Sequence, residues 1–184
     1  MRRLPYSGYA EMRWKNGQGV TREVCRFPTD EQYDWRISIA TIREDGAFSR
    51  FAGYLRNISV LEGEGMFLTV DDQRSALIPQ FQTMDFNGDS AVFCEVVGGP
   101  LLDFNVIYRR ETTQATVCWL HEGAWQHQQG TMLLFNAGDL LDVTVDDERH
   151  TLQHYDSLLI DNPATVTVHA GSDTLFACVT LTSR

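Results

Sequence analysis

The chain has 184 residues, of which 43% are hydrophobic and 22% charged, a composition typical of one globular domain or two small fused lobes. Its formal net charge of −10 argues against a nucleic-acid partner, because binding to phosphates requires a basic surface. No apolar run approaches the length of a membrane span, and no apolar segment of a signal peptide follows Arg2 and Arg3. The four cysteines are widely spaced, without a C-x-x-C pair, which fits reduced thiols. We therefore expect a cytoplasmic protein with no membrane partner.

Short β-prone runs separated by Gly, Asp and Asn follow one another along the chain. The predicted strands cover residues 20–27, 35–42, 57–70, 75–78, 91–97, 103–109, 115–120, 123–128, 131–136, 140–145, 151–153, 157–161, 165–169 and 175–181. No window has a convincing helical period, and at most a single helical turn is predicted, near residues 46–53. Many short strands with such turns indicate an all-β sandwich or barrel. The most polar break near the middle, at residues 110–114, divides the chain into a first lobe (1–110) and a smaller second lobe (111–184).

A polar segment with glycines, residues 12–24, is the most informative stretch near the start of the chain. A turn that presents Lys15, Asn16, Arg22 and Glu23 beside a strand is suited to a small anionic or amide-bearing ligand. The alternative is a surface turn with a solvated ion pair, and on this segment alone that alternative is favoured.

Two predicted strands, 35–42 and 103–109, each have one polar face, because alternate side chains of a strand point in opposite directions. These polar faces carry Arg36, Ser38, Asp103 and Asn105. They are either an outer face in water or the lining of a ligand cavity inside a barrel, and the solvated face is modestly favoured on the strands alone. Arg56, which opens another strand, can hold a carboxylate with two hydrogen bonds, although a lone arginine is more often on the surface.

The sequence predicts no metal site and no cofactor site. Its five histidines are scattered over predicted strands and turns, and His150 and His154 have a spacing that pairs side chains only on a helix. No phosphate-binding glycine loop and no nucleophile motif is present, and Cys25 has no histidine base nearby in the sequence.

The residues between 12 and 109 resemble the HutD/Ves family of bacterial proteins. The segments that carry this resemblance are Trp14-Lys15-Asn16-Gly17, Thr21-Arg22-Glu23, Asp34-Trp35-Arg36-Ile37-Ser38, Asp45-Gly46, Phe48-Ser49, Gly53-Tyr54, Leu61-Glu62-Gly63, Gly99-Pro100-Leu101 and Asp103-Phe104-Asn105-Val106. The resemblance implies a cupin-type (RmlC-like) all-β fold of two small fused β-barrel lobes, a bicupin, without the metal-binding histidines of other cupins. It also implies a regulator or binder linked to histidine utilisation in the HutD branch, or to stress response in the Ves branch. The choice between the branches stays open.

With this resemblance, the ligand cavity in the first lobe becomes the favoured interpretation. The residues expected to line it are Lys15, Asn16, Arg22, Glu23, Arg36, Ser38, Arg56, Asp103 and Asn105. The cations would hold a carboxylate, the amides and the hydroxyl would recognise polar groups, and the two acids would orient the arginines or bind an amino group.

The predicted function is binding of a small anionic metabolite, such as an N-acylated amino acid, by a monomer or a homodimer. The alternative is a metal-independent isomerase or lyase on a small acidic substrate, with Glu23 or Asp103 as the acid or base. An enzyme is the less favoured of the two classes, because no catalytic motif is present.

Overall fold

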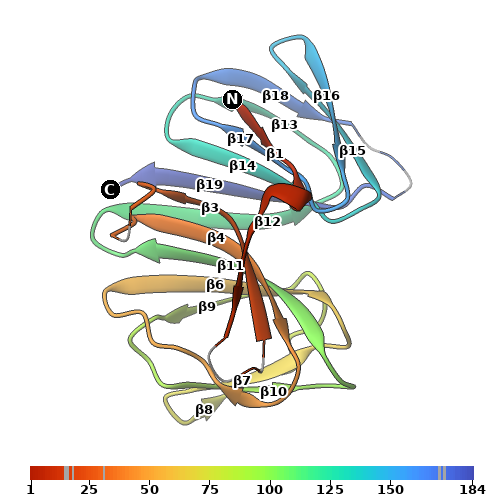
Figure 1. Ribbon diagram of the computed structural model, residues 1–184. Coiled ribbons are helices and arrows are strands. Elements are labelled where there is room, and N and C mark those ends of the chain that lie inside the picture. The colour runs from red at the N-terminus through yellow and green to blue at the C-terminus, as the bar shows by residue number, and fades with distance from the viewer. Residues whose placement is uncertain (15–16, 18, 31, 170, 172) are drawn as a thin grey trace. The chain divides into compact units, whose positions relative to one another are not determined.

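The structure is a computed structural model that describes residues 1–184 except 15–16, 18, 31, 170 and 172. It is built from β-strands, with one 3₁₀ helix, η1 (Tyr6–Gly8), among the described residues (Figure 1). The prediction of an all-β fold is confirmed. The helical turn predicted near residues 46–53 is wrong, because Gly46–Ala47 pairs as a short strand and η1 instead follows Pro5.

The chain divides into two compact units, and the larger unit comprises Ala10–Thr113. A six-stranded sheet has the order β2-β3-β4-β11-β6-β9. Its strands are β2 (Ala10–Arg13), β3 (Gly19–Phe27), β4 (Trp35–Ile42), β11 (Leu101–Arg109), β6 (Tyr54–Glu62) and β9 (Thr83–Asn87). A four-stranded sheet has the order β5-β10-β7-β8, with β5 (Gly46–Ala47), β10 (Val92–Val96), β7 (Met66–Val70) and β8 (Gln73–Arg74). Apolar side chains of both sheets, including Ile58, Val60, Met66 and Leu68, form a common buried core.

The single strand predicted over residues 57–70 is divided between β6 and β7. Gly63 and Gly65 adopt φ angles of 105° and 128°, which side chains with a Cβ rarely adopt, and they turn the chain between the two strands. The turn joins the two sheets of this unit.

The second unit comprises Met1–Tyr9 together with Gln114–Arg184. One of its sheets has the order β1-β17-β14-β19-β12, with β1 (Arg2–Leu4), β17 (Ser157–Ile160), β14 (Thr131–Asn136), β19 (Phe176–Ser183) and β12 (Thr113–Leu120). The other has the order β13-β18-β15-β16, with β13 (Gly123–His127), β18 (Ala164–Val168), β15 (Leu140–Val145) and β16 (Glu148–Gln153). Its interior is apolar and includes Leu134, Leu141, Leu152, Val166 and Phe176.

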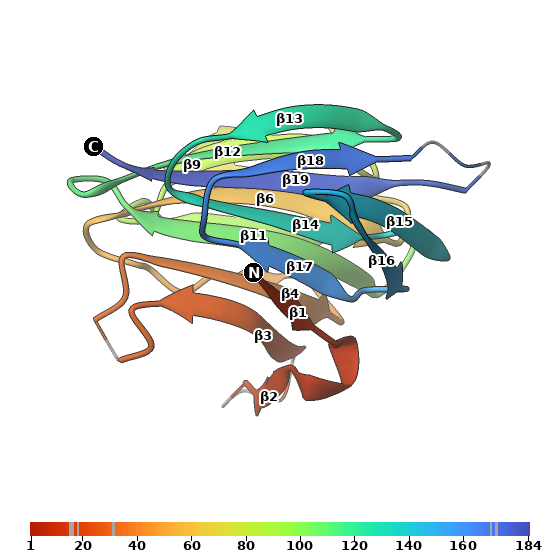
Figure 2. The same cartoon turned by 90° about the horizontal axis from the view of Figure 1, so that it is seen from above.

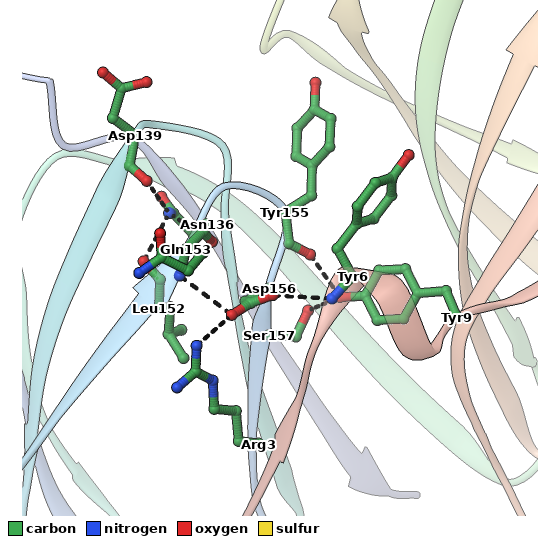
Figure 3. A network of polar contacts seen from close by, with 10 residues as sticks. All are labelled: Arg3, Tyr6, Tyr9, Asn136, Asp139, Leu152, Gln153, Tyr155, Asp156 and Ser157. Atoms are coloured by element: carbon green, nitrogen blue, oxygen red, sulfur yellow. Dashed lines mark hydrogen bonds and ion pairs between the residues drawn. The ribbon is translucent and has the colours of Figure 1, made fainter.

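The first nine residues, which the sequence analysis placed in the first lobe, lie in this second unit. Strand β1 runs antiparallel beside β17, with Arg2 opposite Leu159 and Leu4 opposite Ser157 (Figure 2). The carboxylate of Asp156 accepts hydrogen bonds from Arg3 Nη2 at 2.6 Å, from the Tyr6 backbone N–H at 2.9 Å and from the Gln153 backbone N–H at 3.2 Å (Figure 3). Tyr9 adds a hydrogen bond from its hydroxyl to the carbonyl of Tyr155 at 2.7 Å. A buried acid thus ties the N-terminal segment to the rest of this unit.

We expect Asp156→Asn to lower the free energy of unfolding by about 2 kcal/mol at neutral pH, because a charged acceptor of buried hydrogen bonds is lost. Burial alone would raise the pKa of Asp156, but the hydrogen bonds from Arg3, Tyr6 and Gln153 outweigh burial and lower it. The contribution of Asp156 to the free energy of unfolding is therefore present above the ordinary aspartate pKa of 3.8. It is lost as the pH falls through the lower pKa of the folded state. Urea unfolding at several pH values tests this.

The difference in the free energy of unfolding between the wild type and Asp156→Asn should become smaller below about pH 4. The exposed Asp139→Asn serves as the control and should change stability by less than about 0.5 kcal/mol. An Asp156→Asn variant as stable as the wild type at pH 7 would show that the acid does not hold the N-terminal segment.

Candidate functional site

A cavity of about 590 Å³ lies in the unit Ala10–Thr113, over one face of the six-stranded sheet. Side chains from β2, β3, β4, β6 and β11 line it, together with the segment that follows β5. The lining residues are Met12, Arg13, Trp14, Thr21, Arg36, Ser38, Ala40, Ala47, Phe48, Ser49, Phe51, Arg56, Asp103, Asn105 and Ile107. Its size is sufficient for a small metabolite.

Strand register explains why the polar residues meet in this cavity. Residues directly opposite each other in neighbouring strands point to the same face of a sheet. On β4, β11 and β6, Arg36, Ile107 and Arg56 form one row. Ser38 lies opposite Asn105, and Ala40 lies opposite Asp103. The alternative of a solvated outer face is wrong for this face, since Ser38, Asp103 and Asn105 are all buried.

Arg56 is a buried cation, with only 6% of its surface exposed. Its Nη2 donates to Asn105 Oδ1 at 2.7 Å and its Nη1 donates to the Ser49 carbonyl at 3.5 Å, whereas its Nε has no hydrogen-bond partner among the described residues. The guanidinium carbon lies 5.2 Å from the ring centre of Phe48 and 5.2 Å from that of Phe51. Burial lowers the pKa of Arg56 to about 10, so the side chain remains charged at neutral pH.

No carboxylate forms an ion pair with Arg56 within the described part of the chain. Asp103, the nearest buried acid, is linked to it only through Asn105, whose Nδ2 donates to Asp103 Oδ1 at 2.6 Å. A buried charge is costly unless it is paired, so this arrangement favours an anion beside Arg56.

Asp103 is a buried acid on the floor of the cavity. Its Oδ1 accepts hydrogen bonds from Asn105 and from the Ala40 backbone N–H, the latter at 3.1 Å. Burial raises the pKa of Asp103 from its ordinary value of 3.8 to about 7, against the opposing effects of the Arg56 charge and these hydrogen bonds. Asp103 therefore changes its protonation state near neutral pH.

Arg36 has its charge compensated already. Glu23 accepts from Arg36 Nε at 2.7 Å through one oxygen and from Arg26 Nε at 2.7 Å through the other. Glu23 is thus hydrogen-bonded to Arg36 but does not itself line the cavity. Arg56 is therefore the cation with the greater need for an anion.

The structure brings five of the nine predicted site residues together in the cavity: Arg36, Ser38, Arg56, Asp103 and Asn105. Arg22 is absent from the lining, because it alternates with Thr21 along β3 and instead forms an ion pair with Glu11 at 2.8 Å. Lys15 and Asn16 lie outside the described residues.

Sequence reasoning missed several apolar and small residues of the lining. Trp14 lines the cavity, with its Nε1 donating to Thr21 Oγ1 at 2.8 Å. The rings of Phe48 and Phe51 lie against the guanidinium of Arg56. The signal for this role was the short spacing of two aromatic residues before an arginine.

Two further observations concern metal-ligating side chains and membrane-spanning helices. Within the described ranges, no three His, Cys, Asp or Glu side chains gather as a metal site requires. None of the described residues belongs to a helix that is long and apolar enough to cross a bilayer.

Comparisons with known proteins show the family. A sequence model of the HutD family matches residues 6–176. This chain belongs to the HutD family. An uncharacterized 21.2 kDa protein of the hutC 3′ region of Pseudomonas putida is 40% identical over 157 residues, which are 83% of each chain. Protein Ves of Escherichia fergusonii is 38% identical over 106 residues, 56% of each chain. The structure of HutD from Pseudomonas fluorescens SBW25 is 36% identical, with a TM-score of 0.87 over 100% of this chain and 98% of that one.

A more distant likeness concerns the fold alone. A cupin 2 conserved barrel domain protein from Leptotrichia buccalis shares only 10% identity but superposes with a TM-score of 0.63 over 94% of this chain and 92% of that one. The HutD-family chain therefore has the cupin-like all-β fold that the resemblance implied.

Proposed function

We propose that this HutD-family protein binds a small anionic metabolite, through a carboxylate, in the cavity at Arg56. The single observation that carries the proposal is the buried guanidinium of Arg56, which has an unpartnered Nε and no carboxylate paired with it among the described residues. A bound carboxylate would supply that charge and accept hydrogen bonds in a fork geometry.

The other polar groups of the cavity favour a ligand with further hydrogen-bonding atoms. Ser38 and Asn105 lie in one row beside Arg56, and Arg36 adds an oriented cation. Trp14, Phe48 and Phe51 form an apolar wall. This combination suits a small acid with an amide or hydroxyl group, such as an N-acylated amino acid.

The names of the relatives support a proposal about the biological role of this binding. One of them lies in a hutC 3′ region, another bears the name HutD and a third the name Ves. We infer a binding protein of the cytoplasm that needs no metal and that senses or buffers an acid of histidine utilisation or of a stress response.

A thermal-shift screen against intermediates of histidine degradation and other small carboxylic acids tests this function. A specific ligand at 100 times its Kd should stabilise the protein by about 2.7 kcal/mol and raise the Tm by several degrees. Neutral amides of the same acids are the matched controls and should give no shift. Equal thermal shifts with the acids and with their amides would contradict the proposal. Stoichiometric zinc, iron or manganese in the purified protein would contradict the part of the proposal that says the protein needs no metal.

A metal-independent enzyme is the second candidate, and the raised pKa of Asp103, about 7, favours it. An acid or base with a pKa near neutrality is suited to proton transfer. Turnover distinguishes the two functions: if a ligand found in the screen stays chemically unchanged after long incubation with stoichiometric protein, the enzyme is excluded for that ligand.

A further inference from the structure

Asp103 and the proposed ligand depend on the same buried cation. Arg56 contacts Asn105, and Asn105 contacts Asp103, so the charge of Arg56 is the nearest compensation for an ionised Asp103. A carboxylate seated on the unpartnered Nε of Arg56 would place two negative groups around one guanidinium inside a buried site. Like charges in such a site are not both ionised without a large cost.

The hydrogen bonds indicate which of the two groups takes the proton. A ligand carboxylate would touch Arg56 directly, whereas Asp103 is separated from it by the side chain of Asn105. Both hydrogen bonds given to Asp103 by the described residues reach Oδ1, from Asn105 and Ala40. Oδ2 is thus the oxygen suited to carry a proton, and a protonated Oδ2 can also donate to the ligand.

Among the residues that the structure describes, the other charged groups around Asp103 do not offset a second anion. From β4, Arg36 is engaged by Glu23 of β3, which also holds Arg26. From β2, Arg13 is at the rim, where its side chain is 85% exposed. From β10, burial and the charge of Asp103 raise the pKa of the Cys94 thiol to about 12, so Cys94 remains neutral.

We propose that an anion enters this cavity together with a proton from solvent, which Asp103 takes up, so that the protein binds the anion and the proton as a pair. The step is RCOO⁻ plus H⁺ plus ionised Asp103 giving RCOO⁻ on Arg56 and neutral Asp103, with no other bond made or broken. This inference rests on the proposed function and adds a pH dependence to it. The raised pKa of the free Asp103 supports it, since little further shift is needed for protonation at neutral pH.

Acetate is the probe for the test, because it remains ionised throughout the range studied. Its Kd is measured by NMR at constant ionic strength from about pH 6 to about pH 8.5, with the indole N–H of Trp14 as a reporter at the cavity wall. Above the pKa of Asp103 in the free protein, the Kd should rise about tenfold per pH unit. In Asp103→Asn the Kd should no longer depend on pH. The exposed Glu44→Gln, a control in the same unit, should keep the wild-type profile.

A second readout requires no variant. The ¹³C shift of the Asp103 carboxyl carbon reports its protonation, and its midpoint should move to higher pH when acetate is added. If acetate binds but neither its Kd nor this midpoint changes, proton coupling is wrong while anion binding stands. If acetate does not bind at any pH, carboxylate binding at Arg56 fails, and the coupling fails with it.

Discussion

Replacing Arg56 with methionine should weaken the binding of small carboxylates by roughly 30-fold or more. Truncating one partner of a buried, hydrogen-bonded charge pair costs about 2–5 kcal/mol of binding free energy. Arg56 is the cation for which this reasoning holds, because it is buried and its Nε has no partner within the described part of the chain, whereas Arg36 is already paired with Glu23. The affinity is measured by calorimetry or NMR with acetate and with any ligand found by thermal shift.

The folded state should tolerate Arg56→Met. A buried charge is costly to desolvate, and replacing it with an apolar side chain of similar length is often neutral or stabilising. Arg74→Gln is the matched control: its side chain is 50% exposed and paired with Glu95 outside the cavity. Binding that survives in Arg56→Met, or that is lost equally in Arg74→Gln, would refute the assignment of the site.

The second large effect concerns stability. Phe176→Ala should lower the free energy of unfolding by about 3–5 kcal/mol, because removal of a buried aromatic ring loses its contacts and leaves a cavity. Phe176 is fully buried among Leu134, Leu141 and Val166, and its ring meets that of Trp125 edge to face at 6.1 Å. Guanidinium unfolding followed by tryptophan fluorescence measures the change.

Leu140→Ala is the control for this variant. Leu140 is in the same unit but 53% exposed, so the expected loss is below about 0.5 kcal/mol. If Phe176→Ala cost no more than Leu140→Ala, the apolar interior of this unit would not be tightly packed. A changed denaturant slope would instead show an altered unfolded state.

Local sequence information was sufficient for most of the strands and for the faces of the sheet, but it did not predict β1, β2 and β9. The period-two alternation in residues 35–42 and 103–109 placed Arg36, Ser38, Asp103 and Asn105 correctly, because a strand directs alternate side chains to opposite faces whatever its neighbours are. The same rule excludes Arg22 from the cavity once Thr21 is known to line it. Arg22 is as polar as the residues around it, but the alternation along β3 directs its side chain to the other face.

The pairing of charges was beyond local reasoning. Glu23 is held by Arg36 of the neighbouring strand and by Arg26 of its own strand. Asp156 is held by Arg3, which is 153 residues away in the chain. Several arginines and acids compete as partners in any unfolded or extended chain. Only the packed strands decide which of them meet.

Residues 12–24 illustrate both what the sequence determines and what requires the tertiary structure. The sequence by itself determined an all-β chain with turns at its glycines, a polar sheet face and the family to which it belongs, because these depend on residue order and on the alternation of strands. Only the tertiary structure decided that Trp14 and Thr21 line a cavity while Arg22 does not, and that Arg56 is buried without a paired acid among the described residues. Burial and charge compensation are properties of strands brought together from residues 10–113, so no local pattern contains them.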